Sequence, residues 1–191
     1  MKQRTCLRFL IAGAVFLGIL ALPTSGSAAE GKIRAAAGVY GIYGIPALQE
    51  NIAAGPLYGA KARADLAGPL GAEVSFTSFP SGDITFKTQS GDQTTKGYSQ
   101  SVIAADLILQ TTGPSGFGIY VLGGIGSYSL KKDFAESISR FCYNRGLGLE
   151  FRSNSGIAVD ICGRLHAMPY ENGGTHKFAA VQAGVNYYFL R

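Results

Sequence analysis

Beyond about residue 30 the sequence lacks any run of about 20 apolar residues, so a membrane-spanning helix is excluded there. Tryptophan is absent, and only three cysteines are present. No basic stripe with interleaved aromatic residues occurs, so nucleic acid is not expected as a partner. Removing Lys2, Arg4 and Arg8 from the 17 lysines and arginines leaves 14, against 12 acidic residues. The basic balance of the chain therefore owes much to its first residues.

The N-terminal segment has the layout of a Sec signal peptide. A positively charged start precedes an apolar run at 9–22, which Pro23 ends. Ser27-Ala28-Ala29 then offers small residues where a signal peptidase cleaves. The sequence predicts a signal peptide over 1–29, cleavage after Ala29 and one domain over 30–191. Cys6 has no lipobox around it, so a lipoprotein is not expected.

The remainder alternates apolar and polar residues with the period of two that is typical of strands. Eight such segments occur, at 33–43, 57–66, 71–79, 98–110, 117–130, 141–152, 156–168 and 177–189. The connections between them are alternately long and short, and the long connection at 80–97 is expected to be disordered. Short periplasmic turns and longer extracellular loops are typical of outer-membrane barrels. The sequence thus predicts an all-β fold, an eight-stranded antiparallel up-and-down transmembrane β-barrel.

Alternation alone does not show which face of each strand points outward, so a soluble lipocalin-like barrel stays open as an alternative. Three features favour the membrane. The polar faces are rich in glycine, which would make room for long charged side chains in a narrow lumen. The apolar faces carry aromatic residues near both ends, as in the girdles of membrane barrels. This predicted aromatic girdle comprises Tyr43, Tyr58, Phe117, Phe141, Tyr143, Phe151, Tyr187 and Phe189.

The third feature is that the charges on the polar faces balance. Buried charges persist only when they are paired and hydrogen-bonded. The predicted interior charge network has five cations, Arg34, Lys61, Arg63, Arg152 and Arg164, and five anions, Asp65, Glu73, Asp106, Glu150 and Asp160.

Three stretches resemble the small outer-membrane β-barrel family of OmpA-, OmpX- and OmpW-type proteins. Residues 184–189 are similar to the closing Gly-x-Asn-Tyr-x-Phe strand, and residues 123–128 resemble a central strand rich in glycine and tyrosine. Glu73 stands where the family tends to carry an inward glutamate. The resemblance implies that Phe189 is the signal read by the barrel-assembly machinery, although Leu190 and Arg191 follow it here.

No catalytic, metal or cofactor site is expected. A serine follows Glu150 closely without a histidine nearby, and His166, His176 and Glu171 show no ligand spacing. Cys142 and Cys162 face inward on neighbouring strands, but their offset of five residues is about 16 Å. That separation is too large for a disulfide, so buried free thiols are expected.

These observations predict a non-enzymatic, monomeric outer-membrane protein. Its role would be structural or in surface interaction, through extracellular loops such as 80–97 and 131–140, with a lumen plugged by paired charges. The expected partners are outer-membrane lipid, the barrel-assembly machinery and an unidentified loop ligand. Two alternatives remain: a soluble lipocalin-like periplasmic carrier, and an OmpW-like narrow channel for small solutes.

Overall fold

The computed structural model describes residues 33–45, 55–79, 83–88, 91–96, 99–111, 116–131, 138–169 and 175–189. The predicted signal peptide and its cleavage site after Ala29 lie outside these residues. No helix within the described ranges is long and apolar enough to cross a membrane.

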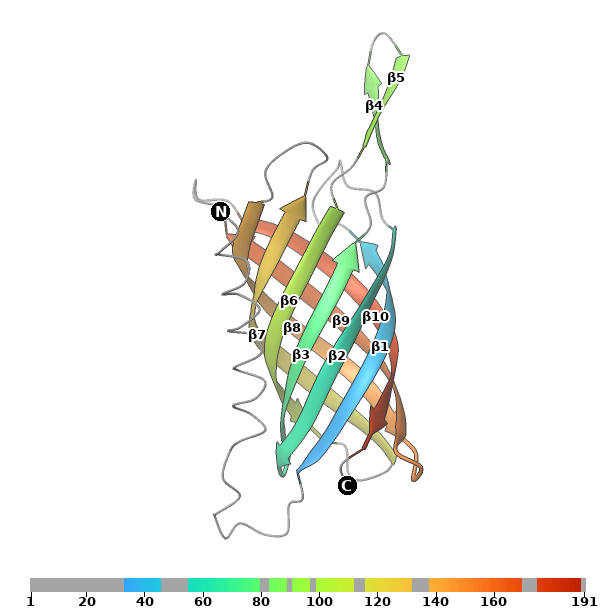
Figure 1. The fold of residues 1–191 in the computed structure, drawn as a ribbon, viewed down its shortest axis with the longest axis vertical. Coiled ribbons are helices and arrows are strands. Elements are labelled where there is room, and N and C mark those ends of the chain that lie inside the picture. Colours follow the sequence, from blue (N-terminus) through green and yellow to red (C-terminus); the bar gives the residue numbers. More distant parts are fainter. Residues whose placement is uncertain are drawn as a thin grey trace. The chain divides into compact units, whose positions relative to one another are not determined.

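Eight strands close into one antiparallel barrel, which confirms the predicted fold class (Figure 1). Each barrel strand pairs with the next one along the chain, and β1 pairs with β10 to close the circle. The barrel strands are β1 (Arg34–Ile45), β2 (Gly55–Ala67), β3 (Leu70–Phe79), β6 (Ser99–Gln110), β7 (Gly116–Lys131), β8 (Ile138–Arg152), β9 (Ile157–Pro169) and β10 (Thr175–Tyr188).

The segment 80–97, expected to be disordered, instead contains a hairpin of β4 (Asp83–Thr88) and β5 (Gly91–Lys96). Its many threonines and polar residues suggested a loop, but Ile84 and Phe86 alternate with threonine, which favours a strand. Gly91 has a φ of 114°, a conformation that glycine adopts without strain, where the chain reverses. The prediction of disorder was therefore wrong for this part of the segment.

Two of the predicted long loops are shorter than expected, because the strands continue past the predicted bounds. Leu130 of β7 pairs with Ile138 of β8, and Thr175 of β10 pairs with Pro169 of β9. The connections are 132–137 and 170–174, against predicted loops of 131–140 and 169–176. Backbone pairing thus persists beyond the segments in which side-chain alternation was recognised.

The two ends of the barrel differ in their connections. At one end, here called the turn end, Gly68 lies in the tight β2–β3 turn with a φ of 54°. The β8–β9 turn there is closed by a backbone hydrogen bond from Gly156 to Ser153. β1 begins and β10 ends at this same end. The opposite end, here called the loop end, carries the longer connections.

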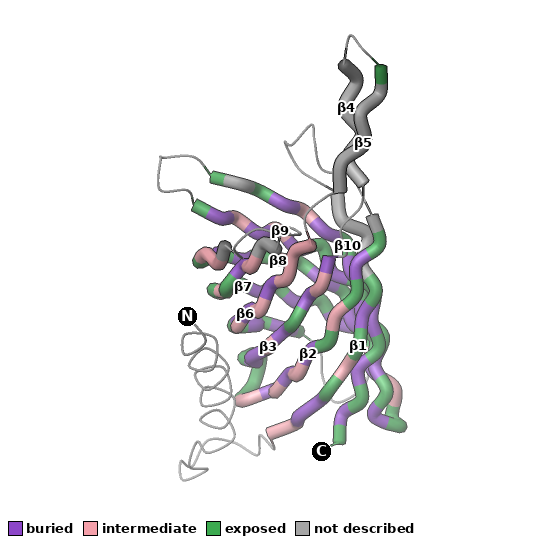
Figure 2. The backbone as a smooth tube through the Cα atoms, turned by 45° about the horizontal axis from the view of Figure 1, so that its top comes forward, coloured by how far each residue is buried: buried purple, intermediate pink, exposed green. Residues whose placement is uncertain are grey.

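Burial alternates along each barrel strand, with apolar residues outward and polar residues inward (Figure 2). Leu149 is 44% exposed, Val159 50% and Val185 49%, whereas Asp160 is 1% exposed and Arg164 3%. A carrier of lipocalin type would bury the first three in a dry centre. The orientation of the faces therefore excludes that alternative.

Candidate functional site

The candidate site is the barrel lumen, where eight ionised side chains form one continuous chain of alternating charge. Each member contacts the next by an ion pair. The order of contact is Arg34, Asp65, Arg152, Glu150, Arg63, Glu73, Arg164 and Asp106. Lys61 and Asp160 form a separate pair, so all ten residues of the predicted network are engaged. All but Arg34, which is partly exposed, are buried.

Arg63 and Arg164 each bridge two carboxylates in the middle of the lumen. Arg63 donates to Glu73 at 2.8 Å and to Glu150 at 2.6 Å. Arg164 donates to the other oxygen of Glu73 at 2.5 Å, and its second amino group lies 3.1 Å from Asp106. The planar guanidinium presents several donors in a fixed fork, and it can therefore satisfy two carboxylates without reorienting.

Asp65 is the centre of a smaller group at the turn end. It accepts from Arg152 at 2.6 Å and from Arg34 at 3.0 Å. The amide of Gln110 donates to Asp65 at 2.7 Å and accepts from Arg152 at 3.1 Å. Both oxygens of Asp65 therefore have partners, as buried carboxylates require.

The Lys61–Asp160 pair is completed by two polar groups that the sequence did not single out. Lys61 donates to both oxygens of Asp160 at 2.7 Å. Tyr120 donates its hydroxyl to Asp160 at 2.8 Å, and Asn186 donates its amide at 3.1 Å. Without these donors a buried carboxylate with a single cation would keep unsatisfied acceptors.

Two inward glycines make room for tyrosine rings, in addition to the long charged side chains that the sequence suggested. The Tyr120 ring lies over Gly148 so closely that a Cβ there would stand 2.3 Å from it. The Tyr40 ring lies equally close to Gly59, where an added Cβ would also stand 2.3 Å from the ring. The guanidinium of Arg63 stacks 4.5 Å from the Tyr120 ring centroid, a cation–π contact. The tyrosines thus fill the lumen and also stabilise its cations.

Near the loop end the lumen is apolar, which the sequence reading missed. Inward residues from all eight barrel strands form a buried cluster there, among them Leu57, Phe79, Val102, Met168 and Phe178. The rings of Phe79 and Phe178 pack edge to face at 4.8 Å. The signal available in the sequence was that these apolar residues occupy inward-facing positions where the strands reach the loop end. The lumen therefore has a charged part toward the turn end and an apolar part toward the loop end.

The weak candidates for chemistry are not brought together. His166 is buried in the lumen, with its ring centroid 6.3 Å from that of Phe178. The side chain of His176 and all of Glu171 lie outside the described residues. Ser153 forms hydrogen bonds with the Ser155 hydroxyl and the Ile157 carbonyl in a turn. Glu150 is instead held inside the lumen by ion pairs with arginines. Within the described ranges, no cluster of ligands that could hold a metal occurs.

Cys142 and Cys162 are both buried free thiols. Cys162 lies opposite Gly148 in the β8–β9 register, six residues from Cys142 along β8. That offset is about 20 Å, one residue more than the sequence-based register gave.

The outer wall carries the predicted girdle residues. Phe117, Phe151, Tyr187 and Phe189 are exposed toward the turn end, and Tyr58, Phe141 and Tyr143 toward the loop end. The side chain of Tyr43 lies outside the described residues. Phe117 pairs with Phe151 across β7 and β8, and Phe141 packs against Tyr143 with ring centroids 4.9 Å apart. Apolar wall positions lie between these two aromatic levels.

A model of the outer membrane protein beta-barrel domain family matches residues 12–189. The chain belongs to this family. Among solved structures, this outer-membrane barrel is similar to Neisserial surface protein A, with a TM-score of 0.55 and 12% identity over 82% of this chain and 97% of that one. It is also similar to the N-terminal β-barrel domain of Pseudomonas aeruginosa OprF, with a TM-score of 0.51 and 15% identity over 80% and 97%. Comparison with curated proteins found no match.

Membership places the apolar wall of the outer-membrane barrel against lipid. Arg145 departs from this pattern, because it is exposed on β8 between Tyr143 and Leu147. An arginine facing lipid costs about 2–4 kcal/mol at the bilayer midplane and falls to about 0–1 kcal/mol near the interfaces.

Proposed function

We propose that this outer-membrane barrel is a non-enzymatic, monomeric anchor with a plugged lumen, whose loop-end connections carry recognition at the cell surface. The single observation that supports it best is the fully paired charge chain across the lumen. A pore would need a continuous water-filled path along its axis. Here the buried cations and carboxylates bind each other.

The apolar part of the lumen supports the same proposal. The buried cluster that includes Leu57, Phe79 and Phe178 lies between the charge network and the loop end. A hydrated solute would have to cross both parts in turn. An eight-stranded barrel has an interior just wide enough for its side chains to fill.

A narrow channel of OmpW type is the alternative, and planar-bilayer recordings separate the two. The purified protein should show no conductance steps, and neither should a Glu73→Ala variant, because the apolar part stays in place. Regular steps from the unmodified protein would overturn the plugged lumen.

The recognition role rests on the β4–β5 hairpin and on 131–140. Among the described strands β4 and β5 pair only with each other, and an edge strand of this kind can be extended by a strand from a partner. Exposed loop segments on a rigid scaffold commonly carry binding. We infer that a ligand of this protein engages the hairpin.

Trypsin added to intact cells tests the surface placement of the hairpin. Lys87 and Lys96 lie in β4 and β5 and provide cleavage sites. Cleavage at Lys87 and Lys96 in whole cells, identified by the masses of the fragments and lost in a Lys87→Gln/Lys96→Gln variant that still folds, is the expected result. Protection of both lysines in intact cells, with cleavage after the outer membrane is opened, would overturn the extracellular placement.

We further propose that residues 1–29 are removed after Ala29. The intact mass of the protein from outer-membrane fractions should correspond to a chain beginning at Glu30. A mass that retains residues 1–29 would contradict the proposal.

Phe189 is proposed as the signal read by the barrel-assembly machinery. It is exposed at the turn end, and its backbone N–H donates to Ala35 at 3.0 Å. A Phe189→Ala variant should insert into outer membranes more slowly in cells yet refold normally into pure lipid vesicles. An exposed aromatic elsewhere, Phe117→Ala, serves as the control and should insert at the normal rate.

A further inference from the structure

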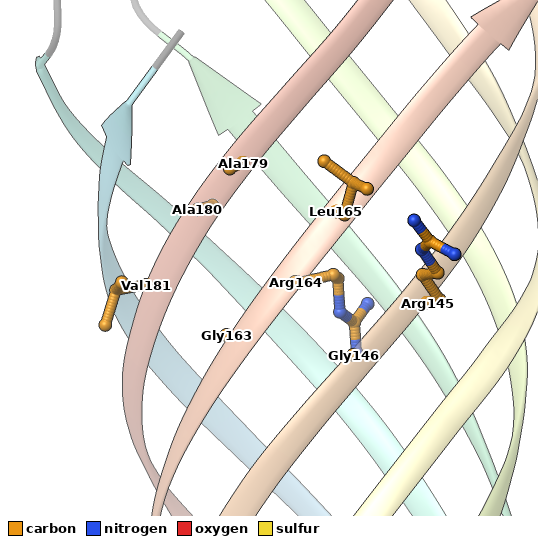
Figure 3. Close-up of a pocket in the computed structure, with 8 residues that line it drawn as sticks. All are labelled: Arg145, Gly146, Gly163, Arg164, Leu165, Ala179, Ala180 and Val181. Atoms are coloured by element: carbon orange, nitrogen blue, oxygen red, sulfur yellow. The ribbon is translucent and has the colours of Figure 1, made fainter. Parts of the chain in front are cut away.

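The outer wall has a shallow groove over β8, β9 and β10, with a volume of about 370 Å³ (Figure 3). Gly163 and Ala179 form its floor, and Leu165 and Val181 stand beside them. Arg145 lies at its β8 side. Four of these five residues are apolar, so the groove offers an apolar seat on a surface that contacts lipid.

The groove exists because small residues occupy outward positions between larger neighbours. Gly163 lies directly between Leu147 of β8 and Val181 of β10 in the register. A Cβ built at Gly163 would meet only the Leu147 carbonyl, at 3.9 Å. The space above the floor is therefore open and could take a side chain or an acyl chain.

Arg145 brings an unpaired positive charge to this apolar seat. Its register neighbours are Gly123 on β7 and Leu165 on β9, and neither has a side-chain acceptor for its guanidinium. The outward positions with described side chains hold one other cation, Lys177 of β10, and no carboxylate. Lys177 lies on the same outward face of β10 as Ala179, one outward position nearer the loop end. The charge around the groove is complementary to an anion.

The depth of Arg145 suits the headgroup level of a lipid. It lies two residues from Tyr143 of the loop-end girdle, a depth of roughly 5 Å along a tilted strand. Figure 3 shows its guanidinium directed along the wall toward the loop end. Long basic side chains extend in this way to bring their charge to the interface while the stem stays in apolar surroundings.

We propose that the groove binds one phosphate-bearing anionic lipid, with an acyl chain over Gly163 and Ala179 and the phosphate on Arg145. The guanidinium fork matches phosphate oxygens by paired hydrogen bonds. Lys177 adds a second positive charge on the same side. The site requires only that the wall faces lipid, and so it stands apart from the proposed role of the loops.

Native mass spectrometry of the detergent-folded full chain tests the proposal. The protein is mixed with equal amounts of phosphatidylglycerol and phosphatidylcholine of identical acyl chains, and the lipid retained on the folded barrel is counted. One phosphatidylglycerol should be retained in preference, by about fivefold, the factor expected for one cation near a membrane surface. Equal retention of the two lipids would overturn the proposal.

Variants assign the two parts of the site. Arg145→Gln should remove the preference for phosphatidylglycerol, whereas Arg145→Lys should keep part of it. Gly163→Val should lower retention of both lipids by filling the floor. Gly41→Val is the matched control, since Gly41 is also outward and exposed with open space around it, but lies on β1.

Each variant is first shown to be folded by its heat-modifiable migration on a gel, and only then is its lipid retention measured. Retention unchanged in Arg145→Gln would contradict the phosphate contact, and retention unchanged in Gly163→Val would contradict the acyl seat. Inorganic phosphate is added in a separate arm. Competition by inorganic phosphate as strong as that by phosphatidylglycerol would show an anion site without a lipid, which also overturns the proposal.

Discussion

Arg164 and Glu73 join opposite walls of the barrel. They belong to β9 and β3, which stand four strand positions apart in either direction around the circle, yet their side chains bond at 2.5 Å. Arg63 on β2 and Glu150 on β8 are related in the same way, at 2.6 Å. These contacts tie together walls that the backbone ladders connect only through the intervening strands.

Replacement of Glu73 by glutamine should destabilise the barrel strongly. Glu73 accepts from both Arg63 and Arg164, and the neutral amide would leave two buried guanidinium groups without their shared counter-charge. Removing one partner of a buried pair costs about 3–5 kcal/mol. Urea unfolding in lipid vesicles, followed by the gel shift, measures this loss. A loss of unfolding free energy smaller than that caused by Asp65→Asn, a substitution at the more open turn end, would contradict the central role of Glu73.

A Cβ at Gly148 should be poorly tolerated because of the Tyr120 ring. Gly148→Ala places a methyl group within 2.3 Å of that ring, and overpacking costs about 1–3 kcal/mol. Tyr120→Leu destabilises by itself, but in its background Gly148→Ala should have little further effect. A double-mutant cycle of unfolding free energies measures the coupling. Gly163→Ala, with open space above it, is the control and should be nearly neutral.

Arg145→Leu should stabilise the barrel in vesicles of phosphatidylcholine alone. The substitution removes a charge from the lipid-facing wall, which is worth about 1–2 kcal/mol at this depth. The unfolding midpoint in urea should therefore move to higher concentration. A lower midpoint would show that Arg145 makes a stabilising contact within the protein itself.

Cys142 and Cys162 should stay reduced under oxidising conditions. They are buried and about 20 Å apart along the strands. A maleimide reagent should label neither cysteine in the folded barrel and both after unfolding without a reductant. Labelling that requires a reductant would reveal a disulfide and contradict the β8–β9 register.

The strands and their faces could be predicted from sequence because one local rule sets them. In β9, alternate residues from Ile157 to Leu165 face lipid, and those between them, such as Asp160 and Arg164, face inward. The period of two needs no knowledge of distant residues. The same rule found the inward cations and carboxylates as a set.

The pairings within that set could not be predicted, because they depend on contacts across the lumen. Arg152 meets Asp65, and Arg63 meets Glu150, each 87 residues away in sequence. Which inward residues reach one another depends on the stagger of the closed barrel and on rings such as Tyr120 that fill the space between them. A local sequence pattern specifies neither the stagger of the barrel nor the positions of these rings. The apolar layer near the loop end was missed for a different reason, since alternation assigns side chains such as Phe178 to the lumen but does not separate an apolar part of the lumen from a charged one.

The pairing of β1 with β10 is the seam at which the first and last strands of the domain meet. Until β10 is present, β1 and β9 each expose a row of unbonded amides and carbonyls, which hydrocarbon does not solvate. The barrel therefore cannot enter the bilayer strand by strand without help at these edges. We therefore expect the ladder to close in lipid only when β10 pairs with both β1 and β9, and a chain truncated before β10 should not yield a stable barrel in lipid vesicles.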